Sequence, residues 1–109
     1  MKQTLIGRFA VDSGQAMIGD PCYLDSWKPW NSEVDNFEDH INKVGEYGYL
    51  GACNATITNN YGELNEGSSV VFNTGWGDGV YPVYANIDDE GTIHSITVNF
   101  VNDQDEEDN

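Results

Sequence analysis

Three residues of this 109-residue chain are of the types that nucleophilic catalysis uses: the thiol of Cys22, the imidazole of His94 and the carboxylate of Asp20. A thiol becomes a nucleophile when a nearby base lowers its pKa, and a carboxylate can orient the imidazole that acts as this base. If strand pairing brought His94 beside Cys22, a Cys-His-Asp arrangement would form. A free cysteine is more often a small buried hydrophobic residue, so the sequence favours burial of Cys22 over catalysis.

Carboxylates on glycine-containing turns suggest a second chemistry, because a hard cation such as Ca²⁺ binds oxygen ligands. Asp12, Asp78 and the run Asp88-Asp89-Glu90 lie on such turns. Their spacing fits no EF-hand loop. Aspartate also favours turns because its side chain accepts hydrogen bonds from the nearby backbone. We therefore expect neither a metal nor a cofactor.

The tryptophans offer a third possibility, since Trp27, Trp30 and Trp76 all lie in predicted loops. Loop tryptophans can stack on a ligand or join a protein interface, but they more often cover the open end of a small β core. A small-ligand pocket, catalytic or not, requires that the residues that line it converge on one concave site. The candidate binding residues for such a site are Asp12, Asp20, Cys22, Trp76, Asp78 and His94.

The net charge restricts the possible partners. The chain has 19 Asp and Glu against 4 Lys and Arg, a formal net charge of −15, and no Lys or Arg follows Lys43. Nucleic acids and anionic membranes are bound through Lys and Arg, so we expect neither as a direct partner. The charge suits a basic surface on another protein, with Asp88, Asp89 and Glu90 as the candidate partner surface.

Length and composition predict one soluble globular domain over residues 1–102, followed by a disordered acidic tail over 103–109. The N-terminus has no apolar segment typical of a signal peptide, and no apolar run is long enough to span a membrane. The two cysteines form no zinc-binding or disulfide-exchange spacing. These features predict a reduced, cytoplasmic protein.

The chain order predicts an α+β fold that is mainly β. Residues 4–12 and 15–19 are expected to form a hairpin around Ser13-Gly14, which Asp20-Pro21 then ends. One helix is predicted over about 32–44, from its N-terminal cap and its apolar stripe. Further strands are expected within 47–58, over 69–73 and 80–87, and over 92–102 after a four-residue turn at 88–91. Pro82 indicates an edge or a bulge. The antiparallel sheets would form a small sandwich or half-open barrel.

Two segments, VDSGQAMIGDPCYL at 11–24 and TGWGDGVYPV at 74–83, resemble an uncharacterised family of phage and bacterial proteins, the domain of unknown function 4241. The resemblance implies a small accessory protein of phage type and transfers no catalytic residue. We expect the two segments to pack together, with the carboxylate of Asp12 or Asp20 accepting hydrogen bonds from backbone amides of a turn.

Three functions remain open from the sequence. The favoured one is a non-enzymatic protein that binds and modulates or inhibits a host protein, with a negative surface that mimics nucleic acid in a counter-defence setting. The first alternative is an enzyme or ligand binder with a pocket near Cys22, Trp76 and His94. The second is a structural or virion-associated module.

Overall fold

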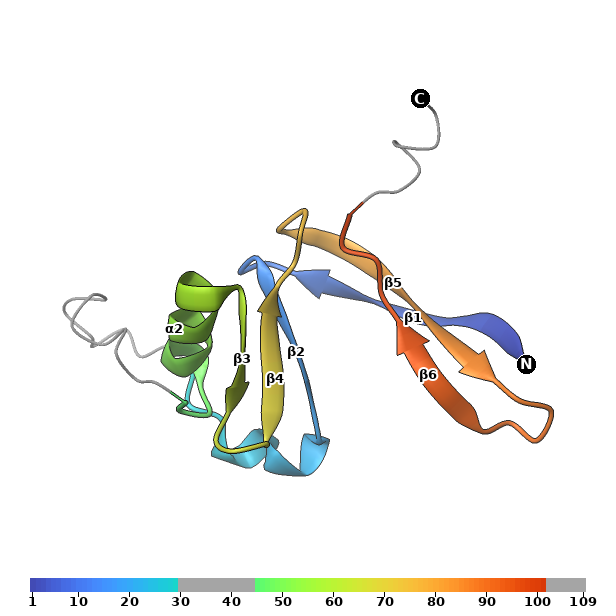
Figure 1. Ribbon diagram of the computed structural model, residues 1–109, viewed down its shortest axis with the longest axis horizontal. Coiled ribbons are helices and arrows are strands. Elements are labelled where there is room, and N and C mark those ends of the chain that lie inside the picture. The colour runs from blue at the N-terminus through green and yellow to red at the C-terminus, as the bar shows by residue number, and fades with distance from the viewer. Residues whose placement is uncertain (30–44, 102–109) are drawn as a thin grey trace. The chain divides into compact units, whose positions relative to one another are not determined.

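The computed structural model describes residues 1–29 and 45–101, and it divides the chain into two compact units. The terminal unit contains Met1–Gly14 and Thr74–Asn109, and the central unit contains Gln15–Asn73. Each unit holds one antiparallel three-stranded sheet (Figure 1). The fold is therefore α+β and mainly β, as predicted. The prediction of one globular domain over 1–102 and that of a sandwich or half-open barrel stay predictions.

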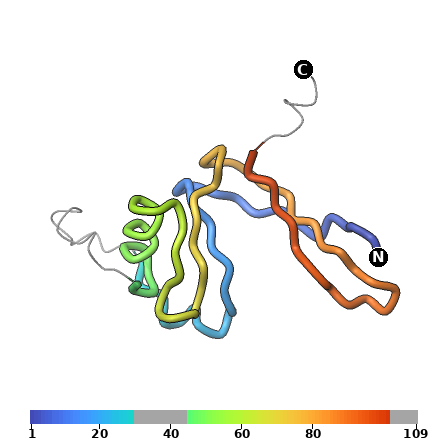
Figure 2. Tube along the Cα trace, viewed as in Figure 1, coloured from blue at the N-terminus to red at the C-terminus, as the bar shows by residue number. Residues whose placement is uncertain are grey.

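The sheet of the terminal unit has the strand order β1-β5-β6. Its strands are β1 (Lys2–Val11), β5 (Gly79–Ile87) and β6 (Ile93–Thr97). Tyr81 and Ala85, four residues apart on β5, are buried on the same face, together with Val11 of β1. The β5–β6 hairpin reverses at residues 88–92, as the orange segment of the trace shows (Figure 2). The turn predicted at 88–91 is thus confirmed.

Pro82 lies in the middle strand of this sheet, yet at a place where the strand is paired on one side only. It lies opposite Arg8 of β1, while the pairing of β5 with β6 begins at Tyr84. The β1 register also shifts between Leu5 and Gly7, close to this point. A proline has no backbone N–H to donate to a ladder, so it is tolerated where one partner strand is missing. The prediction of an edge or bulge at Pro82 is confirmed locally.

The central unit has a sheet of order β2-β4-β3 that packs against one α-helix (Figure 1). Its elements are β2 (Gln15–Gly19), the 3-10 helix η1 (Pro21–Ser26), α2 (Tyr49–Asn59), β3 (Tyr61–Leu64) and β4 (Ser69–Asn73). Tyr47, Ala52, Leu64 and Val71 form the buried core, with Met17, Trp27 and Ala55 packed against it. The strand predicted over 69–73 is confirmed, and so is the end of β2 at Asp20-Pro21.

The predicted hairpin between residues 4–12 and 15–19 is wrong. Both strands exist, but β1 pairs with β5 and β2 pairs with β4. The Ser13-Gly14 turn itself is present, and Gly14 has the positive φ of 72° that such a turn needs. Its backbone groups bond to residues 74–78 instead of closing a β1–β2 ladder. The turn therefore moves the chain from one sheet to the other.

The strand predicted within 47–58 is also wrong, since residues 49–59 form α2. Small residues allow this helix to lie close to the sheet. A Cβ atom added at Gly62 of β3 would come within 2.8 Å of the Cβ of Ala55. Close packing of the helix thus overrides the β propensity of Tyr49, Thr56 and Ile57.

The last strand is shorter than predicted, because β6 ends at Thr97 and not near residue 102. Phe100 lies edge-on to Phe9 and Tyr81, with ring centroids 6.4 and 5.1 Å apart. Its carbonyl accepts a hydrogen bond from the Trp76 amide. The chain leaves the ladder after Thr97 and packs Phe100 on this aromatic cluster. The helix predicted over 32–44 and the tail over 103–109 lie outside the described residues.

Two neighbouring valines of β4 test the burial assignment. Val71 is 2% exposed in the core, whereas Val70 is 48% exposed on the opposite face. We expect Val71→Ala to lower the free energy of unfolding by about 2 kcal/mol, and Val70→Ala by less than about 1 kcal/mol. Urea unfolding of the two variants measures the difference. Equal losses would contradict the placement of α2 over Val71.

Candidate functional site

The segments 11–24 and 74–83, named the signature segments from their resemblance to a family, meet at the turn that contains Gly14, within the terminal unit. The Gly14 amide donates to Oδ1 of Asp78 at 2.8 Å, and the Gly14 carbonyl accepts from the Thr74 amide at 3.0 Å. We call this arrangement of Gly14, Thr74 and Asp78 the junction. The predicted packing of the two segments is confirmed in this form. At the junction the carboxylate that accepts the turn amide is that of Asp78, while the Asp20 carboxylate accepts a backbone amide at Cys22, within its own segment.

A second set of hydrogen bonds fixes the turn that carries Asp78. The hydroxyl groups of Thr74 and Tyr81 both donate to the Gly77 carbonyl, each at 2.7 Å. Thr74 is 4% exposed, and Gly77 has a φ of 79° that disfavours other residues. The residues of TGWGDGVY thus hold the Asp78 carboxylate at the Gly14 amide. In this role the segment is a structural element, and no reacting group is needed to explain it.

Trp76 points outward from the same turn. Its backbone amide is bound to Phe100, but the residue is 55% exposed. It therefore does not cover the core of its unit, unlike Trp27 of the central unit, which packs edge-on against Tyr47. Trp76 remains available for contact with a ligand or a partner.

The predicted burial of Cys22 is wrong, because η1 contains no buried residue and the Cys22 side chain is exposed. Asp20 caps η1 by accepting a hydrogen bond from the Cys22 amide at 2.9 Å. Desolvation and the hydrogen-bonding, negatively charged Asp20 carboxylate raise the pKa of the Cys22 thiol. A raised pKa keeps the thiol protonated, which is the opposite of what a nucleophile requires.

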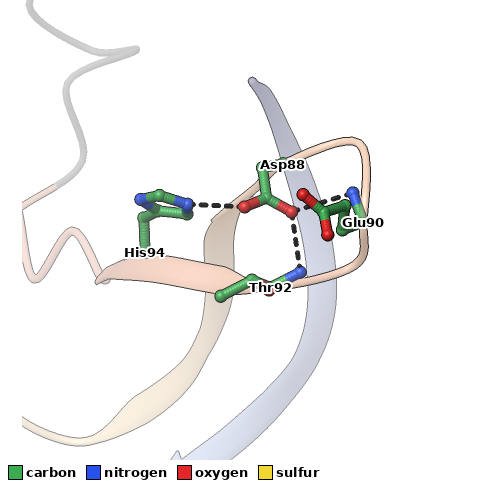
Figure 3. A network of polar contacts seen from close by, with 4 residues as sticks. All are labelled: Asp88, Glu90, Thr92 and His94. Atoms are coloured by element: carbon green, nitrogen blue, oxygen red, sulfur yellow. Dashed lines mark hydrogen bonds and ion pairs between the residues drawn. The ribbon is translucent and has the colours of Figure 1, made fainter.

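His94 is bound to a carboxylate from its own hairpin. Its Nε2 lies 2.8 Å from Oδ2 of Asp88, while Oδ1 of Asp88 accepts the amides of Glu90 and Thr92, both at 2.9 Å (Figure 3). These contacts hold the 88–92 turn together. Asp89 and Glu90 are exposed on the same turn. His94 thus helps to fix the Asp88 carboxylate that holds this turn.

This environment changes the acidity of Asp88. The hydrogen bond from His94, followed by that from the Thr92 amide, lowers the pKa of the Asp88 carboxyl below its ordinary value, and the Glu90 amide adds to this. A carboxyl with a lowered folded-state pKa stabilises the fold above its unfolded-state pKa. That stabilisation is lost as the pH falls through the folded-state value.

The predicted site residues divide between the two units. Asp12, Trp76, Asp78, His94 and the acidic turn 88–90 belong to the terminal unit, whereas Asp20 and Cys22 belong to the central unit. Within the units, Asp20 meets Cys22, Asp88 meets His94, and Asp78 meets the turn that follows Asp12. The pocket near Cys22, Trp76 and His94 stays a prediction.

Sequence reasoning missed a polar cluster under α2. The Gln15 side chain donates to Sγ of Cys53 at 3.5 Å and accepts from the Thr56 hydroxyl at 3.2 Å. A hydrogen bond with Cys53, together with desolvation, raises the pKa of Tyr49. Cys53 is buried, as expected. The i, i+4 spacing of Tyr49 and Cys53 becomes visible only once 49–59 is recognised as a helix.

Over residues 1–29 and 45–101, no group of three or more His, Cys, Asp or Glu side chains is arranged to hold a metal ion. None of the helices found there is long and apolar enough to cross a membrane.

Both segments that meet at the junction lie in a part of the chain that matches a known protein family. The sequence profile of the protein family of unknown function DUF4241 matches residues 4–98. The chain belongs to the DUF4241 family. The match includes both signature segments and all strands except the start of β1. Comparisons with curated proteins and with solved structures find no match. For this DUF4241 chain, the junction gives Gly14, Thr74 and Asp78 a structural role.

Removal of the Asp78 carboxylate tests the junction. We expect Asp78→Ala to lower the free energy of unfolding by about 1 kcal/mol, because the Gly14 amide loses its acceptor. Asp89→Ala removes a carboxylate from another exposed turn and should change stability by less than about 0.5 kcal/mol. Urea unfolding compares the two variants. Equal stability of both variants would contradict a structural role for Asp78.

The contacts of Asp88 in Figure 3 predict how its carboxyl titrates. Carboxyl-detected NMR titration should place the pKa of Asp88 below the ordinary range for aspartate, and His94→Gln should raise it. Ser95→Ala, on the same strand, is the control and should leave the Asp88 titration unchanged. An ordinary Asp88 titration that does not respond to His94→Gln would show that the 2.8 Å contact does not form in solution.

Proposed function

We propose that this DUF4241 chain is a non-enzymatic binding protein whose acidic surface docks on a basic surface of another protein and blocks it. The observation that carries the proposal is that most of the described carboxylates have no ion-pair partner among the described residues. Within residues 1–29 and 45–101, the one ion pair with a Lys or Arg is Lys28–Glu46, at 3.1 Å. Asp88 pairs with His94. The other described carboxylates are exposed and form no ion pair there: Asp12, Asp20, Asp25, Glu63, Glu66, Asp78, Asp89 and Glu90.

Exposed carboxylates without internal cations keep their charge available to a partner. Charge of one sign attracts a surface of the other sign, speeds association and disfavours partners of like charge. A basic groove built for nucleic acid is such a surface, so the acidic chain would compete with nucleic acid for it. The phage members implied by the sequence resemblance suggest a setting in which a phage-encoded chain inhibits a host protein in the cytoplasm.

Within the acidic surface, Asp89 and Glu90 are the residues to test. Asp88 is excluded from the test because its carboxylate holds the turn, whereas no hydrogen bond of the Asp89 or Glu90 side chain supports the turn. The double variant Asp89→Lys with Glu90→Lys changes the surface charge and preserves the Asp88 contacts. The matched control Asp25→Lys with Glu63→Lys makes the same change in net charge on exposed residues of the central unit.

The experiment is affinity capture from lysate of a cell that carries the gene, at about 0.15 M salt, where weak surface attraction is screened. We expect the wild-type chain and the control to retain one basic partner, and the Asp89→Lys, Glu90→Lys variant to bind it about tenfold more weakly, a loss of about 1.4 kcal/mol. Capture of no partner, or equal retention by all three chains, would contradict the proposal.

A further inference from the structure

Strand β6 forms an open edge of the terminal unit's sheet. In the order β1-β5-β6 it pairs with β5 on one side, and no other strand in the described part of the chain pairs with its outer side (Figure 1). All five residues of β6 are exposed, which holds for no other described strand. An exposed edge presents backbone donors and acceptors that can pair with a further strand.

The opposite edge of the same sheet carries features that discourage such pairing. Strand β1 contains Lys2 and Arg8, and its register shifts between Leu5 and Gly7. Charged side chains and bulges are the usual means by which proteins protect an edge. β6 contains no charged residue of the Lys, Arg, Asp or Glu type and no proline. It also contains the β-branched residues Ile93, Ile96 and Thr97, which favour strand pairing.

The geometry of β6 is regular over most of its length. The one register irregularity with β5 lies between Asn86 and Ile87, next to the turn. From there the pairs Asn86–Ser95, Ala85–Ile96 and Tyr84–Thr97 follow in step. Ser95 is fixed from the β5 side, because its hydroxyl accepts a 2.8 Å hydrogen bond from the Asn86 side chain. Pairing with β5 therefore holds the inner edge of β6 in place, and only its outer edge is open to a further strand.

The charge beside this edge selects the kind of strand that could join it. β6 follows directly after the turn that carries Asp89 and Glu90, and both are exposed. A second copy of this chain has the same net charge of −15, so self-pairing would oppose like charges. A segment with Lys or Arg would instead gain attraction.

We propose that β6 accepts an extended, Lys- or Arg-containing segment of a partner protein as an added strand, with the basic side chains close to Asp89 and Glu90. Strand addition supplies affinity through backbone hydrogen bonds and specificity through alternate side chains. The inference rests on the proposed function and assigns its interaction surface to a single element.

The test uses the full chain and a synthetic, end-blocked ten-residue peptide of alternating Lys and Val. The peptide should slow amide hydrogen exchange within Ile93–Thr97 about tenfold and leave β1 unchanged. Two control peptides separate the contributions: alternating Glu and Val removes the charge attraction, and the Lys-Val peptide with every backbone amide N-methylated keeps the charge but has no N–H donor for a ladder. Neither control should protect β6. Asp89→Lys with Glu90→Lys should weaken the effect about tenfold, and Asp25→Lys with Glu63→Lys should not.

Three results would overturn the inference. The first is equal binding of the N-methylated Lys-Val peptide, since charge alone would then suffice. The second is protection confined to residues outside β6, and the third is concentration-dependent dimerisation of the chain through β6, measured by sedimentation. These results would leave capture of a basic protein intact. Failure of that capture while the Lys-Val peptide still protects β6 would instead count against the proposed function alone.

Discussion

The backbone of Gly14 is the point on which the arrangement of the strands depends. Its amide is bound by the Asp78 carboxylate and its carbonyl by the Thr74 amide. Because the Gly14 amide and carbonyl bond to residues 74–78, they do not pair β1 with β2. Strand β1 pairs instead with β5 in one sheet, and β2 pairs with β4 in the other. Within the part of the chain that matches the DUF4241 family, Gly14, Thr74 and Asp78 are thereby explained by hydrogen bonding of a turn, which Tyr81 supports.

Local signals in the sequence predicted the local features correctly. Gly14 takes the positive φ expected of its turn, Asp20-Pro21 ends β2, and Asp88 bonds to the amides of its own turn. Pairing over long separations was not predictable in the same way. A turn residue such as Gly14 predicts that the chain changes direction. It does not predict that the acceptor for its amide is Asp78, 64 positions away in the sequence.

The helix α2 and the exposure of Cys22 show a second limit of sequence reasoning. β-prone residues in 49–59 suggested a strand, and the small residues that allow close helix packing, such as Ala52 and Ala55, carry no β signal of their own. Cys22 was expected inside because cysteine usually is, yet η1 buries nothing. The candidate partner surface at Asp89 and Glu90 came from charge alone, and the structure adds that Asp88 beside them holds the turn. The proposed function therefore rests on exposed charge, and the proposed interaction surface rests on an open strand edge.

The bond between the Asp78 carboxylate and the Gly14 amide holds the two turns together, and NMR can test it directly. The amide proton of Gly14 should exchange slowly with solvent in the wild-type chain, because it is bound to a carboxylate acceptor. In Asp78→Ala this exchange should become about tenfold faster, while in Asp12→Ala, which removes the nearest carboxylate in sequence, it should stay slow. Equal exchange rates of the Gly14 amide in the wild-type chain and in Asp78→Ala would show that the bond does not form.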